Sequence, residues 1–211
     1  MKTERTKYTN LTFVVFITMA LLISATVFAS ADDAKSKVKL VFSQIESSLI
    51  SLKQTQTLTK SNIRDVLSKY LLPEVETRYF TYKVLNKNMS KVPEELREQF
   101  ITELSLQLIN TYSNLLNKYN NEAITIGQSS LSNSGKLAMV DITIVGKTKT
   151  NKAVVKLLQS NVQGWLFFDI ELEGISLLQT KQGEINASFN KLGVEGTLNH
   201  LKKINQKVLD D

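Results

Sequence analysis

The chain has 211 residues, 42% of them hydrophobic and 22% charged, and its formal net charge is +6. The length suits one domain of ordinary size, and the apolar fraction allows a sizeable core, which excludes a wholly disordered chain. The absence of cysteine excludes disulfides, thiolate metal sites and an acylated cysteine anchor, and the single histidine, His200, excludes a multi-histidine metal site.

The basic excess consists of scattered lysines and not of an arginine-rich run. We therefore expect no nucleic acid among the partners. The charge fits an anionic membrane surface or an acidic protein partner, and it also fits an ordinary solvated surface.

The first 31 residues have the pattern of a secretory signal peptide. A basic segment, "MKTERTKYTN", precedes the uncharged apolar run "LTFVVFITMALLISATVF", and the small residues "ASA" follow at 29–31. The sequence predicts a cleavable signal peptide at residues 1–31 and a single exported domain at residues 32–211. Cleavage after Ala29 or after Ala31 both remain open. An uncleaved membrane anchor is the alternative, because the apolar run is long for a signal peptide.

Residues 33–119 have the apolar spacing of α-helices. The first predicted helix buries a face made of Val38, Val41, Ile45, Leu49 and Leu52. A hydroxyl at Thr59 or Ser61 is placed to cap a second helix, which Pro73 ends. A third segment carries Val75, Tyr79, Tyr82 and Leu85. The clearest helix starts at Pro93, and its apolar face consists of Leu96, Phe100, Leu104, Leu108, Tyr112, Leu115 and Tyr119.

Between residues 123 and 172 the apolar period changes to two, which is typical of strands. Four strand candidates, "EAITIG", "KLAMVDITIVG", "AVVKLLQS" and "GWLFFDIEL", are separated by short polar turns, so we expect an antiparallel meander. One face is predicted to carry Ala138, Val140, Ile142, Ile144, Leu166, Phe168, Ile170 and Leu172, and the other face Asp141, Thr143, Asp169 and Glu171.

The helical period returns after Gly174 and is interrupted by "LGVEG" at residues 192–196. The predicted fold class is therefore α+β, with N-terminal helices, a four-stranded antiparallel meander and C-terminal helices packed on one sheet face.

The junction "GISLL" at residues 174–178 looks like the start of a G-x-S-x-G nucleophile elbow. Leu178 replaces the final glycine, and His200 in a lysine-rich helix is the one histidine that could act as base, so a catalytic Ser176 is disfavoured. We instead predict a capping box in "SLLQ", in which Ser176 caps a helix and Gln179 bonds back to the Ser176 N–H. His200 is expected to be exposed or at a helix end.

A carboxylate pair could also serve acid–base chemistry, as Asp169 with Glu171 or with Glu173, because residues two apart on a strand share a face. On the polar face of a sheet such groups are more often solvated or paired with lysine. We find no phosphate-loop, dinucleotide or calcium-loop motif. What remains is an abundance of apolar residues, which fits either a filled core or an apolar cavity.

Four segments occur in a characteristic order: "LLPEVETRYFTYKVLNKNM", "VPEELREQFITELSLQLINTYSNLLNKY", "GWLFFDIELEGISLLQTKQGEI" and "NKLGVEGTLNHLKK". Together they resemble the MlaC-type, toluene-tolerance family of periplasmic phospholipid-binding proteins, and "GW…FDIELEGISLL" is the most specific part. The chain departs from the family where it has Lys181, Gln182 and Ile185, since the family usually has a tyrosine–arginine pair and a phenylalanine there.

The resemblance implies a periplasmic carrier that shuttles phospholipid between an outer-membrane lipoprotein complex and an inner-membrane ABC transporter complex with an MCE-type component. It implies phospholipid as cargo, no cofactor, no metal and no catalytic residue, with the acyl chains in an apolar cavity between sheet and helices. The residues that we expect to line this cavity are Val75, Tyr79, Leu104, Leu108, Tyr112, Leu115, Val140, Ile142, Ile144, Phe168, Ile170 and Leu172. The alternative is a non-enzymatic adaptor or structural protein of the cell envelope with a filled core.

Overall fold

The computed structural model describes residues 30–117 and 122–210, so all but the last two residues of the predicted signal peptide lie outside the described part. The helices are α2 (Ala31–Gln54), α3 (Lys60–Tyr70), α4 (Thr77–Leu85), α5 (Glu94–Leu116) and α6 (Leu177–Asp210), with 3-10 turns η1 (Leu72–Glu74) and η2 (Asn86–Lys91). The strands are β1 (Ala123–Leu131), β2 (Leu137–Val145), β3 (Thr150–Ser160), β4 (Gly164–Leu172) and β5 (Ile175–Ser176). Within the described ranges, no helix is both long enough and apolar enough to cross a membrane.

The strands follow one another across a single sheet in the order β1-β2-β3-β4-β5, and each is antiparallel to the next. The predicted α+β class and antiparallel meander are confirmed. The predicted four strands become five because Ile175 and Ser176 fold back onto Leu172 and Glu171. The turn between them needs a glycine, since Gly174 has φ +79°, a conformation that L side chains rarely adopt.

A β-bulge in β4 corrects one part of the predicted sheet face. Leu157 pairs with Phe167 but Lys156 pairs with Asp169, so β4 has one extra residue at this point. The side chain of Leu166 therefore projects from the face opposite to that of Phe167, and the prediction that Leu166 shares the face of Val140 is wrong.

The predicted positions of Ile170 and Leu172 are confirmed, because both lie beyond the bulge. Ile170 pairs with Val155, which pairs in turn with Val140 on β2. Directly opposite residues in an antiparallel sheet point to the same side. The apolar face of the sheet is thus continuous from β2 to β4.

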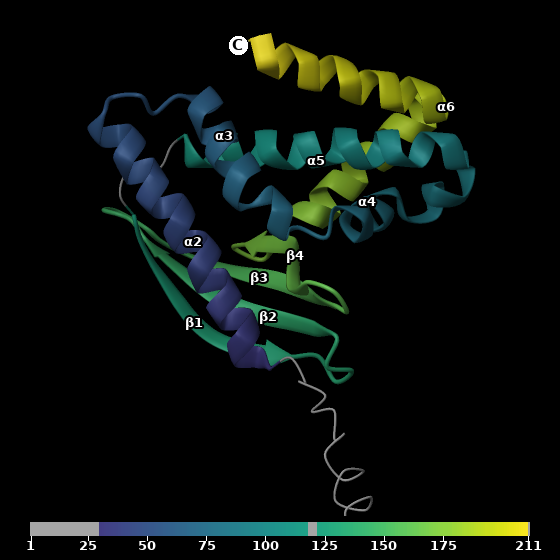
Figure 1. The fold of residues 1–211 in the computed structure, drawn as a ribbon. Helices are drawn as coiled ribbons and strands as arrows, with labels where there is room; N and C mark the ends of the chain where they lie inside the picture. Colours follow the sequence, from purple (N-terminus) through teal and green to yellow (C-terminus); the bar gives the residue numbers. More distant parts are fainter. Residues whose placement is uncertain (1–29, 118–121, 211) are drawn as a thin grey trace, which may run out of the picture.

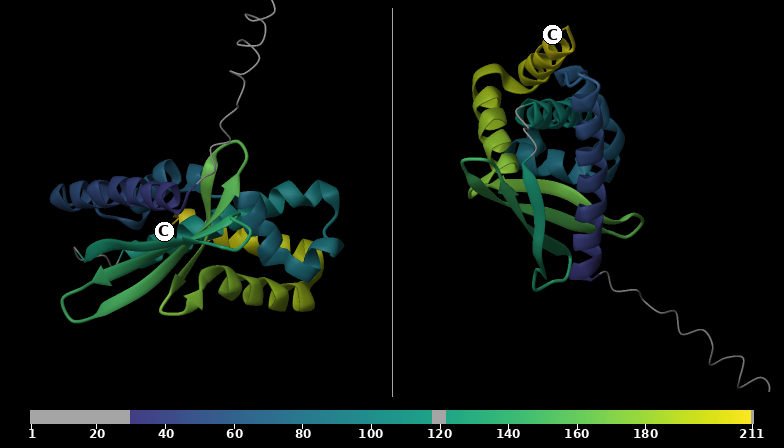
Figure 2. Two further views of the ribbon diagram at one scale, coloured as in Figure 1. Left: turned by 90° about the horizontal axis from the view of Figure 1, so that it is seen from below. Right: turned by 90° about the vertical axis from the view of Figure 1, so that its left-hand side faces the viewer.

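The helices cover this apolar face. Figure 1 shows α2 lying diagonally across the sheet, where it contacts β1, β2 and β4. In the right-hand view of Figure 2, α5 lies between α6 on one side and α2 on the other. The predicted face of α2 is buried at Val38, Val41, Ile45 and Leu49, and it joins the sheet residues in one apolar core. Removing this area from water is the main term that stabilises the arrangement.

Two helix starts follow from hydroxyl caps. Ser30 Oγ accepts a hydrogen bond from the Asp33 N–H at 3.1 Å, and the Asp33 carboxylate accepts from the Ser30 N–H at 2.8 Å, which is a capping box at the start of α2. The Ser30 carbonyl also accepts from Trp165 Nε1 at 3.1 Å, so this start is fixed to the sheet. Of the two predicted caps for α3, Thr59 is the one observed.

Helix α6 consists of two parts that meet at Gly193, whose φ of +70° and ψ of −169° are not helical. The first part packs against α4 and η2, where Gln182 donates to the Lys83 carbonyl and Asn88 to Asn186. The second part packs against α5 through a buried amide network on Asn205, whose side-chain oxygen accepts from Gln107 and Asn110. The predicted interruption at "LGVEG" is therefore a kink between two differently anchored parts.

Candidate functional site

The structure gathers eleven of the twelve predicted cavity residues in the interior. Buried are Val75, Leu104, Leu108, Val140 and Ile142, and partly buried are Tyr79, Tyr112, Ile144, Phe168, Ile170 and Leu172. Most of them belong to the apolar core or pack against it, and the rings of Tyr79 and Phe168 meet edge to face with centroids 5.2 Å apart. Leu115 is 46% exposed and lies on the surface of α5, away from this group.

A small cavity lies where α4, α5 and the start of α6 meet β4. Its volume is about 70 Å³, and its wall consists of Phe80, Leu108, Thr111, Tyr112, Asp169, Leu177, Leu178, Thr180, Lys181 and Glu184. The wall combines aliphatic and aromatic side chains with a few polar and charged groups, which is the usual composition of a binding pocket. Of the predicted residues, Leu108 and Tyr112 belong to this wall.

Asp169 and Ser176 fix the start of α6 beside the cavity. The Asp169 side chain is 4% exposed, and its carboxylate accepts hydrogen bonds from Ser176 Oγ at 2.8 Å and from the Leu178 N–H at 3.1 Å. Ser176 Oγ in turn accepts from the Gln179 N–H at 3.0 Å, so its predicted capping role is confirmed. The predicted return bond from the Gln179 side chain is not among the hydrogen bonds of the described residues, and Asp169 supplies the second acceptor for the helix start.

Lys156 neutralises the carboxylates on this side of the sheet. Its Nζ lies 3.3 Å from Asp169 and 2.8 Å from Glu171, as the prediction of lysine-paired carboxylates required. Partial burial by itself lowers the pKa of Lys156, but the two carboxylates outweigh it and hold that pKa above its ordinary value. The pair of carboxylates that the sequence offered for acid–base chemistry is thus engaged with one ammonium group.

Tyr112 carries a hydroxyl into the apolar interior. Burial, with a smaller contribution from the negative charge of Asp169, raises the pKa of Tyr112 well above its ordinary value. The phenol therefore keeps its proton over the whole physiological range and remains a hydrogen-bond donor.

Lys181 brings a cation to the cavity wall one turn after Ser176. It forms an ion pair with Glu184, three residues further along α6. The two side chains differ in exposure, since Lys181 is 15% exposed and Glu184 is 56% exposed. The ammonium group is thus held against the protein, whereas its partner reaches into solvent.

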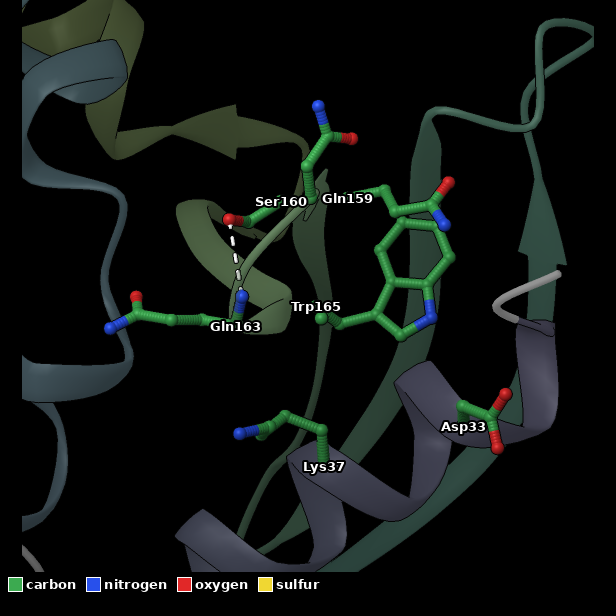
Figure 3. Close-up of a pocket in the computed structure, with 8 residues that line it drawn as sticks. Asp33, Lys37, Gln159, Ser160, Gln163 and Trp165 are labelled. Atoms are coloured by element: carbon green, nitrogen blue, oxygen red, sulfur yellow. Dashed lines mark hydrogen bonds between the residues drawn. The ribbon is translucent and has the colours of Figure 1, made fainter. Parts of the chain in front are cut away.

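A larger depression of about 540 Å³ lies between the start of α2 and the β3–β4 turn. Figure 3 shows its Trp165 indole above the α2 side chains Asp33 and Lys37, with Ser160 and Gln163 on the other side. Apart from Trp165, the wall of this depression is largely polar. Acyl chains placed here would remove water from these polar groups without replacing its hydrogen bonds. We therefore take the smaller cavity between α4, α5 and α6 as the candidate site for an apolar ligand.

In the described part of the chain, the hydrogen bonds of the Ser176 side chain go to the Asp169 carboxylate and the Gln179 N–H, which are those of a helix cap. His200, the one possible histidine base, is exposed on the second part of α6, as predicted. Among the described residues, no group of histidine, aspartate and glutamate is placed to hold a metal ion. Ser176 and Asp169 serve the helix start through the bonds given above.

Sequence reasoning missed the polar part of the cavity wall, namely Thr111, Thr180, Lys181 and Glu184. A usable signal existed on α6, because Thr180, Lys181 and Glu184 follow the cap at Ser176 within two helical turns and residues three and four apart share a helix face. Nothing in the sequence indicated that the start of α6 packs against α5, because this contact depends on the direction in which the chain leaves the β4–β5 turn.

The fold and site define an α+β domain whose helices pack on an antiparallel sheet and line a small cavity with both apolar and polar groups in its wall. Residues 42–203 match the sequence profile of the family described as "MlaC protein". Because this match spans most of the chain, the protein belongs to the MlaC family, as the sequence motifs indicated.

Two relatives extend this comparison. The chain is 21% identical over 198 residues, covering 91% of each chain, to the intermembrane phospholipid transport system binding protein MlaC of Haemophilus influenzae. Its fold resembles that of the phospholipid-binding protein from Ralstonia solanacearum, solved in complex with a phospholipid, with a TM-score of 0.73 and 17% identity. That likeness covers 83% of this chain and 98% of the other, and it supports the fold described above.

Proposed function

We propose that this protein is a periplasmic phospholipid carrier that makes and breaks no covalent bond. The observation that carries the proposal is the match to the MlaC family, and a small cavity with apolar side chains in its wall, where α4, α5 and the start of α6 meet β4, is consistent with it. The relatives named as a phospholipid transport protein and as a phospholipid-binding protein support phospholipid as the cargo.

The physics of lipid transfer explains why such a carrier is needed. Two acyl chains of about sixteen carbons resist transfer to water by roughly 25 kcal/mol, at about 0.8 kcal/mol per CH₂ group. If the protein interior is about as apolar as the membrane core, the free energy of transferring the acyl chains from membrane to protein is close to zero. The carrier itself then needs no energy source, and its partners set the direction.

The cargo requires the cavity to enlarge. The cavity of about 70 Å³ is far below the roughly 300–1,000 Å³ of ordinary ligand pockets. In this proposal the first part of α6 moves, with hinges at Gly174 and Gly193, whose φ angles are +79° and +70°. Its displacement from α4 and α5 would join the cavity to the core, where the residues predicted to line it are found.

We place the protein in the periplasm, after export by the predicted signal peptide. Its partners in this proposal are an inner-membrane ABC transporter complex with an MCE-type component and an outer-membrane lipoprotein complex. The relative's description as part of an intermembrane transport system supports this placement between two membranes.

The test is extraction of the purified protein. After denaturation and extraction into organic solvent, mass spectrometry is expected to find phospholipid in near-stoichiometric amount. The close packing of the core favours one competing function, a cell-envelope adaptor with a filled interior. That alternative predicts an extract without lipid, and such a result would end the carrier proposal.

A further inference from the structure

Lys181 occupies a distinctive position in the cavity wall. The wall to which it belongs combines apolar residues such as Phe80, Leu108 and Leu177 with the polar residues Thr180 and Glu184. The Lys181 side chain is 15% exposed, so most of it lies against the protein and only a small part reaches solvent. A long aliphatic stem with a charged end suits such a position.

The partner of Lys181 can be replaced. Glu184 is 56% exposed, and a carboxylate that remains this accessible to water is held only weakly by its ion-pair partner. The other carboxylate of the wall, Asp169, is already bound by Lys156, Ser176 and the Leu178 N–H. An incoming anion therefore competes with Glu184 alone for the Lys181 ammonium.

The donors of the wall favour an anion with oxygen acceptors. The Thr111 hydroxyl donates to the Gln107 carbonyl within α5, and the Thr180 hydroxyl donates to the carbonyl of Ser176, the cap of α6, so both protons are already used in hydrogen bonds. Lys181 and Tyr112 remain as donors, and Tyr112 keeps its proton because burial disfavours the phenolate. Lysine is a common point-charge ligand for phosphate.

We propose that Lys181 binds the phosphate group of the lipid at the mouth of this cavity and that Glu184 holds the ammonium group when no lipid is bound. This inference rests on the proposed carrier function and assigns the headgroup contact within it. The ligand chemistry is a phosphate ester anion whose acyl chains enter the space between α4, α5 and α6.

Opposite effects of two substitutions test this assignment. The full mature chain is incubated with phosphatidylglycerol vesicles, repurified and extracted, and the lipid bound per protein is measured. Lys181→Gln is expected to retain several-fold less lipid than the wild type, whereas Glu184→Gln is expected to retain as much or more. Lys181→Arg keeps the charge and is expected to restore retention, and Lys202→Gln, on the second part of α6, is the matched control.

Two further arms identify the source of the phosphate. With diacylglycerol dispersed in micelles of a nonionic detergent, which offers the same chains without phosphate, the wild type and Lys181→Gln are expected to bind equally. Inorganic phosphate added to the phosphatidylglycerol vesicles is expected to leave lipid retention unchanged, because it lacks the chains that supply most of the binding energy. Displacement of the lipid by inorganic phosphate would assign the site to the free ion and overturn the headgroup proposal.

The remaining outcomes separate this inference from the carrier function. Equal losses in Lys181→Gln and Glu184→Gln mean that the ion pair is structural, and a loss in Lys181→Arg as large as that in Lys181→Gln means that charge is not what matters. Either result overturns the headgroup contact while the wild type still carries lipid. A wild type that acquires no lipid from any vesicle removes the carrier function itself. Unfolding curves of each variant check that its fold is retained.

Discussion

The hydroxyl of Ser176 donates a 2.8 Å hydrogen bond to the buried carboxylate of Asp169 while it caps α6. Strand β4 and the start of α6 are thereby joined through the Ser176 side chain. The Ser176 hydroxyl, which stands where a nucleophile elbow would place its serine, makes two hydrogen bonds that hold the sheet and the helix start together. Stability is the property that its removal should change first.

Ser176→Ala is expected to lower the free energy of unfolding by about 1–2 kcal/mol, since it removes an N-cap and one hydrogen bond to a buried carboxylate. Urea denaturation measures this loss. Ser134→Ala is the control, because Ser134 lies exposed in the turn between β1 and β2. Its free energy of unfolding is expected to stay near the wild-type value. An unchanged stability combined with loss of a hydrolytic activity would instead support an enzyme.

Gly193→Ala is expected to destabilise the protein by about 1–3 kcal/mol, because φ +70° with ψ −169° is a conformation open almost only to glycine. The cost is conformational, since no atom lies within 4 Å of an added Cβ. Gly183→Ala is the matched substitution in the same helix. Gly183 also has no atom near an added Cβ but shows no positive φ, so alanine there is expected to stabilise by up to about 1 kcal/mol. Effects of the same sign in thermal unfolding would contradict this distinction.

Tyr112→Phe is expected to change how stability depends on alkaline pH. Burial raises the pKa of Tyr112 in the folded state, so the unfolded chain loses this proton first. The stabilising contribution is complete below the unfolded pKa of about 10 and is lost as the pH rises through the folded-state pKa. Denaturation at several pH values should give a steeper alkaline decline for the wild type than for the variant, and parallel declines would refute the assignment.

Leu108→Trp is expected to reduce lipid loading, because Leu108 lies in the cavity wall and a larger side chain fills the space. Overpacking should also cost roughly 1–3 kcal/mol of stability. Leu115→Trp places the same side chain seven residues later on α5, where Leu115 is 46% exposed. Loading should change little there, and an equal loss would mean that the lining extends to Leu115 as the sequence predicted.

Regular elements were predictable because periodicity records them directly. The buried residues of α2, such as Val38 and Val41, recur at helical spacing, and Ile142 and Ile170 alternate as strand residues do. The bulge beside Phe167 was not predictable, since one inserted residue leaves hydrophobic composition unchanged yet reverses the face of Leu166.

The site was predictable only in part, for a related reason. The helix cap at Ser176 has a local motif, whereas its bond to Asp169 depends on how the chain turns back after β4. Apolar side chains that fill a core and those that line a cavity have the same spacing, so Leu104 and Leu108 could not be distinguished beforehand. Lys181 is a candidate ligand-binding residue only because the start of α6 lies against α5, and this contact has no signal in the sequence.

The hydrogen bond from Trp165 to the Ser30 carbonyl bears on the two cleavage sites that the sequence predicts. A signal peptidase that cuts after Ala29 leaves Ser30 as the new amino terminus, with its charged ammonium against the Asp33 carboxylate and its carbonyl still paired with the indole. A cut after Ala31 removes both the cap of α2 and the acceptor of Trp165. If the predicted signal peptide is cleaved, a difference of two residues in the cleavage position thus decides whether the remaining chain keeps the anchor of its first helix.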